Sequence, residues 1–124
     1  MKRIDIDDPE VDMDLSLRLL YRGELFTGEV EEYLGGVRVS LASYADGFPH
    51  GPSRSWHKNG TRQSEGTLRT GSPAGVWRTW HPNGALAVRM VMSDDGARQL
   101  ARFEWDEDGM LTKEWHADGH ADGG

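Results

Sequence analysis

The chain has 124 residues with no cysteine, and 21 Asp and Glu against 14 Lys and Arg give it a formal net charge of −7. Without cysteine it has no disulfide and no Cys-based zinc site. Its acidity argues against nucleic-acid binding, which needs a basic surface. No apolar run approaches membrane-spanning length, and the N-terminus lacks the apolar core of a signal peptide, so we expect a cytoplasmic protein. The 16 glycines indicate many turns and short strands.

Residues 1–23 form an acidic N-terminal segment. Over residues 10–19, apolar and polar side chains alternate strictly, which predicts one half-buried strand at the edge of a sheet. Asp12 and Asp14 would stand on its outer face, in a row of carboxylates. Such a row would keep an edge strand from pairing with other chains. It could also serve as an acidic arm that docks on a basic partner.

Residues 24–119 repeat with a period of about 24 residues. Turn glycines recur at this interval, in one set at Gly36, Gly60, Gly84 and Gly109, and in a second set at Gly47, Gly71 and Gly96 that closes the opposite turns. Gly51 and Gly75 have the same spacing and are also expected to close turns. Each period holds two strands and two turns. The pattern therefore predicts an all-β fold, a repeat meander of antiparallel hairpins in one extended twisted sheet. Residues 120–124 are expected to form a flexible tail.

The turn His81–Gly84 combines proline, asparagine and glycine in the order of a three-residue hairpin loop, a type I turn followed by a left-handed glycine. Its register predicts facing pairs: Trp80 with Leu86, Arg78 with Val88, Val76 with Met90, and Trp77 with Arg89 as a cation–π pair. The same loop in the neighbouring hairpins would pair Trp56 with Arg62 and Trp105 with Leu111.

Three tryptophans recur at the repeat period, and we expect Trp56, Trp80 and Trp105 to form a stripe on one face of the sheet. The stripe could be core or a partner-binding surface, since a single-layer sheet has little with which to cover an apolar face. We expect the Trp80 face to be covered and the Trp77 side to be available. No catalytic, cofactor-binding or metal-binding constellation stands out, so we expect no enzyme and no cofactor.

The segment Gly75–Leu86 reads Gly-Val-Trp-Arg-Thr-Trp-His-Pro-Asn-Gly-Ala-Leu and follows a Gly-Ser-Pro-Ala-Gly turn. This pattern resembles the MORN-repeat variant family, and the resemblance covers about residues 24–119. The glutamate typical of that family is present at Glu65 and Glu114, while Arg89 stands there in the unit between them. The resemblance implies stacked antiparallel hairpins. Bacterial chains of the YwqK-like group in this family are often assigned as antitoxins or immunity proteins.

The resemblance, with the small size and acidity, implies a protein-binding antitoxin or immunity protein whose partner is a toxin with a basic surface. The expected contact residues are Trp56, Trp77, Trp80, Arg89, Trp105, Asp12 and Asp14. The alternative is a non-catalytic scaffolding or membrane-associated module, as in the wider MORN family. The acidity disfavours a membrane, because anionic headgroups attract basic segments. A homodimer that covers the apolar face also remains open.

Overall fold

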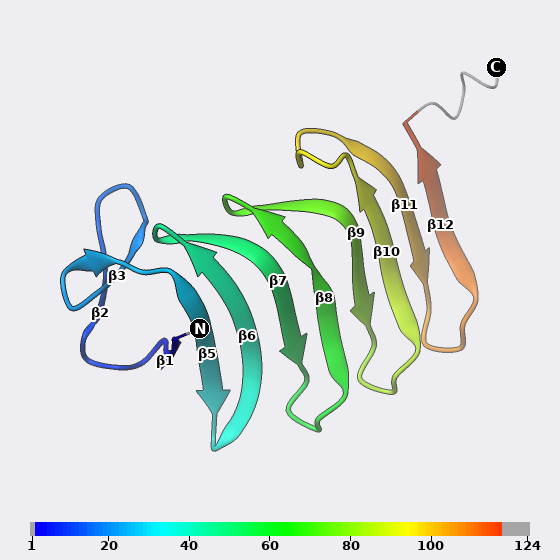
Figure 1. Ribbon diagram of the computed structural model, residues 1–124. Coiled ribbons are helices and arrows are strands. Elements are labelled where there is room, and N and C mark those ends of the chain that lie inside the picture. Colours follow the sequence, from blue (N-terminus) through cyan, green and yellow to red (C-terminus); the bar gives the residue numbers. More distant parts are fainter. Residues whose placement is uncertain (1, 118–124) are drawn as a thin grey trace.

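The computed structural model describes residues 2–117, and Figure 1 shows them as strands joined by turns. Nine strands form one sheet in the order β1-β5-β6-β7-β8-β9-β10-β11-β12. From β5 onward each strand pairs antiparallel with the next strand in sequence, while β1 pairs parallel with β5. The predicted all-β repeat meander is therefore confirmed. The tail expected at 120–124 lies outside the described residues.

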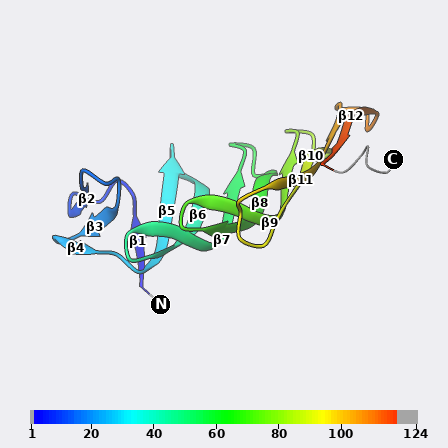
Figure 2. The same ribbon diagram turned by 90° about the horizontal axis from the view of Figure 1, so that it is seen from above.

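The strands of the large sheet are β1 (Arg3–Asp5), β5 (Gly28–Leu34), β6 (Val37–Ala45), β7 (Phe48–Trp56), β8 (Arg62–Arg69), β9 (Ser72–Trp80), β10 (Leu86–Met92), β11 (Gln99–Trp105) and β12 (Leu111–His116). A smaller three-stranded sheet precedes them, with β2 (Val11–Met13), β3 (Leu19–Tyr21) and β4 (Glu24–Leu25). In Figure 2 the large sheet runs as one twisted layer, and the small sheet lies at its β5 end.

The turns at one edge of the sheet have the predicted conformation. Gly60, Gly84 and Gly109 have φ of 91°, 91° and 85°. Each glycine N–H donates to the carbonyl three residues earlier, at 2.9, 2.9 and 3.0 Å. Gly36 also has a positive φ, but it closes a tighter turn with Gly35, and both residues are left-handed. Glycine carries these positions because it has no Cβ to clash.

Gly51 and Gly75 do not close turns, so their predicted role is wrong. They lie inside β7 and β9 with φ of 107° and 68°, close to places where the pairing register shifts. Gly47 and Gly71 close the turns at this edge, as the second glycine set predicts, in the dipeptides 46–47 and 70–71, whose residues all have positive φ. Two left-handed residues in succession make the type I′ turn, which matches the twist of a hairpin.

The predicted register holds at the turns and fails beyond them. Trp80 faces Leu86 as expected. A bulge at Ala87 then shifts the pairing by one residue, so that Val88 faces Thr79. The same shift follows the Trp56–Arg62 and Trp105–Leu111 pairs. The other predicted pairs are wrong: Arg78 faces Arg89, Val76 faces Val91, and Trp77 faces Met90.

The single strand predicted over residues 10–19 is also wrong, because a turn divides it into β2 and β3. The Asp14 carboxylate accepts backbone hydrogen bonds from Ser16 and Arg18 at 2.9 and 2.8 Å. Leu17 takes a left-handed conformation with φ of 63°. Aspartate side chains commonly compete with strand pairing in this way. As a result Leu15 and Leu17 point to solvent, although their alternation suggests burial.

The hydrophobic core lies at the N-terminal end of the molecule. Leu19, Phe26, Ile4 and Val30 are buried together there. The backbone joins the two sheets, since the Leu19 N–H donates to the Gly47 carbonyl at 2.8 Å. Farther along the large sheet, the buried hydrophobic residues are small alanines at 74, 87 and 101. From β7 to β12, therefore, no other element of the described chain covers either face of the sheet.

Candidate functional site: an arginine and tryptophan face

The three periodic tryptophans lie in one row beside the His81–Gly84 edge of the sheet. Trp56, Trp80 and Trp105 hold the same place in successive hairpins, each facing the first residue of the next strand. All three are half-buried. Arginine side chains cover the first two rings, with the Arg38 guanidinium 5.1 Å from the Trp56 ring and that of Arg62 5.2 Å from Trp80. The predicted stripe is thus present, and it contains arginines.

A second row crosses the same face one step farther from these turns. Cross-strand partners share a face, and pairing runs in succession through Arg54, Glu65, Arg78, Arg89 and Phe103. The Arg89 guanidinium lies 5.4 Å from the Phe103 ring, so its aromatic partner is Phe103 and not the predicted Trp77. We call the residues of the two rows, from Arg38 on β6 to Trp105 on β11, the arginine–tryptophan face.

Three arginines of this face lack an ionic partner. Within residues 2–117, no ion pair involves Arg54, Arg78 or Arg89. Glu65 lies between Arg54 and Arg78 in the row, but its Oε1 is 2.8 Å from Nη1 of Arg62. This contact is an ion pair without hydrogen-bond geometry, and Oε1 accepts no hydrogen bond within the described chain.

Two shallow hollows adjoin these arginines. One, of about 250 Å³, lies between Arg54 and Arg78 and includes Thr67 and Val76 in its lining. The other, of about 210 Å³, lies on the β5 side of Arg54 and is lined in part by Leu41. The surface therefore offers recesses next to the unpaired cations.

Charge is sharply segregated along the chain. Residues 2–36 contain four Lys and Arg and ten Asp and Glu. Residues 37–92 contain seven Lys and Arg and only two Asp and Glu, a net charge of +5. Residues 93–117 contain three Lys and Arg and seven Asp and Glu. The middle hairpins are thus basic, with an acidic region on each side.

The opposite face differs in chemistry and in coverage. Trp77 lies against Gly66 there, and a Cβ on Gly66 would meet the Trp77 ring at 2.2 Å. Pairing places Val30 on this same face, through Ala42 and Ser53. Because Val30 belongs to the core beneath the small sheet, this face is covered at β5 but not at Trp77. The small sheet does not cover the Trp80 face, so our expectation that this face is the covered one is wrong, and from β7 to β12 the described chain leaves both faces open.

Histidine and asparagine side chains link successive repeats. They donate to backbone carbonyls one repeat farther on, in four hydrogen bonds: His57 to Trp80 at 2.9 Å, His81 to Trp105 at 2.8 Å, Asn59 to Pro82 at 3.1 Å, and Asn83 to Glu107 at 3.0 Å. These side chains therefore have a structural role that ties the tryptophan row together.

The last described turn replaces these donors with acceptors. Asp106 and Asp108 stand where the preceding repeats have histidine and asparagine. The Asp106 carboxylate accepts hydrogen bonds from the N–H groups of Asp108 and Met110, both at 2.9 Å. In the described chain no hairpin follows β12, so a donor at this turn would have no carbonyl of a next repeat to bond. The Asp106 carboxylate needs none, because it accepts hydrogen bonds within its own turn.

The two predicted acidic contact residues lie away from the tryptophan row, in the region of the small sheet. Asp12 is exposed on β2. Asp14 is half-buried, and its Oδ2 accepts a hydrogen bond from Arg18 Nε at 2.8 Å. The Arg18 backbone N–H, together with the other hydrogen bonds to this carboxylate, lowers the pKa of Asp14 below its usual value. Asp14 thus shapes a turn, and its contact with a partner stays a prediction.

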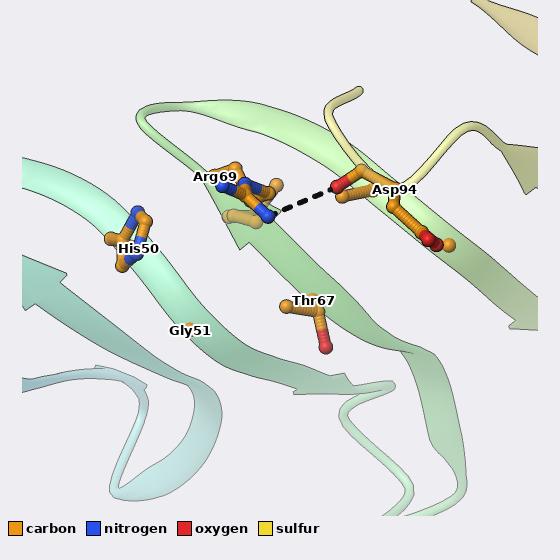
Figure 3. Close-up of a pocket in the computed structure, with 8 residues that line it drawn as sticks. His50, Gly51, Thr67, Arg69 and Asp94 are labelled. Atoms are coloured by element: carbon orange, nitrogen blue, oxygen red, sulfur yellow. Dashed lines mark hydrogen bonds between the residues drawn. The ribbon is translucent and has the colours of Figure 1, made fainter. Parts of the chain in front are cut away.

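A larger hollow, of about 560 Å³, lies near the other edge of the sheet and is shown in Figure 3. His50, Thr67 and Arg69 face it from β7 and β8, and Arg69 donates to the Asp94 carbonyl at 3.3 Å. His50 Nδ1 accepts the Thr70 N–H at 3.2 Å. Arg69 and His50 are thus engaged by the backbone, and the lining does not bring a nucleophile to a base.

Residues 2–117 contain no cluster of three or more His, Asp or Glu that could hold a metal ion. The same residues contain no helix long and apolar enough to cross a membrane.

No protein-family model matches this chain, and neither the curated proteins nor the solved structures include a significant match. Function therefore has to be argued from the surface itself.

Sequence reasoning missed Arg54 and Arg78 as surface residues of interest. A signal was present, since they are one repeat apart, as are Arg38 and Arg62. The net charge of −7 concealed them, because the acidic ends outweigh the basic middle.

Proposed function

We propose that this chain is a non-catalytic protein-binding module that contacts its partner through the arginine–tryptophan face. One observation carries the proposal: the periodic, half-buried tryptophans lie on a sheet face that no other part of the described chain covers. Aromatic and arginine side chains are enriched at protein interfaces, and they contribute much of the binding energy there. A rigid sheet presents such residues without an ordering cost on binding.

Within this class, we favour a cytoplasmic antitoxin or immunity protein. The resemblance of the repeat to the MORN-repeat variant family supports this choice. It is an analogy at the level of the fold. The alternative is a non-catalytic scaffolding module, for which the same face would bind a permanent partner.

The proposal is tested by co-expression with the product of the adjacent reading frame, followed by affinity purification and a growth-rescue assay. Trp80→Ala and Trp105→Ala should each weaken capture and rescue by about tenfold or more, the loss expected at an interface hot spot. Trp115→Ala is the matched control, because Trp115 pairs with Arg102 and so lies on the opposite face. Thermal melts of each variant separate lost binding from lost folding.

Two results would count against the proposal. If the Trp115 variant lost binding as much as the Trp80 and Trp105 variants, another surface would carry the interaction. Sedimentation with vesicles of phosphatidylserine and phosphatidylcholine tests the membrane-associated alternative, and binding there without any protein capture would favour it.

A further inference from the structure

We propose that the region of the arginine–tryptophan face from β7 to β10 binds an acidic polypeptide segment, whose carboxylates pair with Arg54, Arg78 and Arg89. This inference rests on the proposed function and specifies the chemistry of the partner. An acidic partner takes the place of the basic partner that the net charge of the whole chain predicts. The negative net charge comes from the two ends of the chain, whereas this face is basic.

The row of Arg54, Arg78 and Arg89 carries unbalanced positive charge. Arg78 and Arg89 are direct cross-strand partners, and like charges at such positions destabilise a sheet. Arg54 lies two strands from Arg78, a distance of roughly 10 Å at the usual strand spacing. A carboxylate placed between such guanidiniums would relieve their repulsion and form charge-assisted hydrogen bonds. The hollow of about 250 Å³ that Arg54 and Arg78 line gives a carboxylate room to enter, beside Glu65, whose own carboxylate is paired with Arg62 at 2.8 Å.

The basic region of the sheet is narrow. It spans the strands β6 to β10, a width of roughly 20 Å at the usual strand spacing. The acidic region before it and the acidic region after it would repel a long polyanion that continued across the sheet. A short acidic segment of a protein can end within the basic region, whereas a nucleic acid strand or an anionic membrane extends beyond it.

The tryptophan rings of this face are poorly suited to a nucleic acid. Single-stranded nucleic acids are held largely by bases that stack on exposed aromatic rings. Arg38 and Arg62 already lie over Trp56 and Trp80, so a base could stack on that side of these two rings only by displacing a guanidinium. Both guanidiniums also pair with a carboxylate of this chain, Arg38 with Glu31 and Arg62 with Glu65. The chemistry therefore favours an acidic polypeptide.

A second copy of this chain is a poorer occupant, although its N-terminal segment is acidic. Three of the carboxylates there are already engaged in turns: Asp5 accepts the Asp7 N–H, Asp8 accepts that of Glu10, and Asp14 accepts that of Ser16. Docking on the arginines would compete with these hydrogen bonds. A partner with free carboxylates has no such cost.

The test uses the full chain and a fluorescein-labelled peptide of alternating glutamate and threonine, with the glutamine version as the neutral control. A triple variant, Arg54→Gln, Arg78→Gln and Arg89→Gln, should bind the acidic peptide roughly tenfold more weakly, as expected for three exposed ion pairs. The matched control removes three positive charges elsewhere, through Arg22→Gln, Arg98→Gln and Lys113→Gln. It should bind as the unaltered chain does, and binding should weaken as salt is raised.

Several outcomes would overturn the inference. These are equal binding of the acidic and neutral peptides, equal losses in the two triple variants, and tighter binding of oligothymidylate or phosphatidylserine vesicles than of the acidic peptide. A dimer in analytical ultracentrifugation that the arginine triple variant abolishes would also overturn it, since the occupant would then be a second copy.

The inference and the proposed function can fail separately. If a captured partner depends on Trp80 but is unaffected by the arginine triple variant, the face binds protein without acidic recognition. If neither set of variants affects capture, the proposed function itself is wrong.

Discussion

Replacing Gly66 with alanine tests the packing of the Trp77 face, because two effects of opposite sign compete there. Glycine to alanine in an unstrained strand removes freedom from the unfolded chain and stabilises by about 0.4–1 kcal/mol. At Gly66, however, the added Cβ would lie 2.2 Å from Cε3 of Trp77 and 2.8 Å from its Cδ2. The ring would have to move off the sheet, and overpacking of this kind costs about 1–3 kcal/mol. We expect a net destabilisation of about 1–2 kcal/mol.

The assay is a double-mutant cycle with Trp77→Ala, measured by urea unfolding and thermal melts. In the unaltered background Gly66→Ala should lower Tm by several degrees, since about 1 kcal/mol corresponds to roughly 4 °C in a domain of this size. In the Trp77→Ala background the clash is gone, and the same substitution should become neutral or stabilising. Equal effects of Gly66→Ala in the two backgrounds would refute the reasoning.

Three further predictions concern other parts of the fold. His81→Ala removes one hydrogen bond between repeats and should cost about 0.5–1.5 kcal/mol in urea unfolding. Leu19→Ala should cost about 2–5 kcal/mol because Leu19 is 0% exposed, whereas Leu15→Ser, at a fully exposed position, should change stability by less than about 0.5 kcal/mol. The lowered pKa of Asp14 stabilises the folded turn above the usual aspartate pKa of 3.8, and this contribution is lost as pH falls through the folded value. The protection factors of the turn amides should therefore fall only at pH values below the usual aspartate pKa, and Asp14→Asn should lower them already at neutral pH.

The repeat was predictable because glycine at a regular spacing indicates turn positions that need a left-handed residue. Gly60, Gly84 and Gly109 stand where the chain needs a left-handed residue, and their spacing defines the period. The register beyond each turn was not predictable, since nothing in the local sequence distinguishes Ala87 as the bulged residue. A shift of one residue moves every later side chain to the other face, which is why Trp77 and Arg89 were wrongly paired.

The strand predicted in the N-terminal segment was wrong, and the basic face was missed, for different reasons. The alternation through Leu15 and Leu17 satisfies the strand pattern, but the carboxylate of Asp14 captures backbone N–H groups first. The row that contains Arg54 and Arg78 depends on pairing between strands, which a single sequence shows only after the register is known. A net charge taken over each repeat, in place of the whole chain, would have revealed the basic middle.

The change from histidine and asparagine to Asp106 and Asp108 determines where a further hairpin could be added to the sheet. A copy of residues 61–84 inserted after Gly84 would contain its own histidine and asparagine donors. These would be followed by a repeat whose backbone carbonyls can accept their hydrogen bonds. Such an insertion would widen the sheet by two strands, roughly 10 Å. A copy added after β12 would meet two carboxylates that have no proton to donate. Within the described residues, an inserted repeat would therefore keep the hydrogen bonds between hairpins, whereas the turn at Asp106 offers none of the donors that make them.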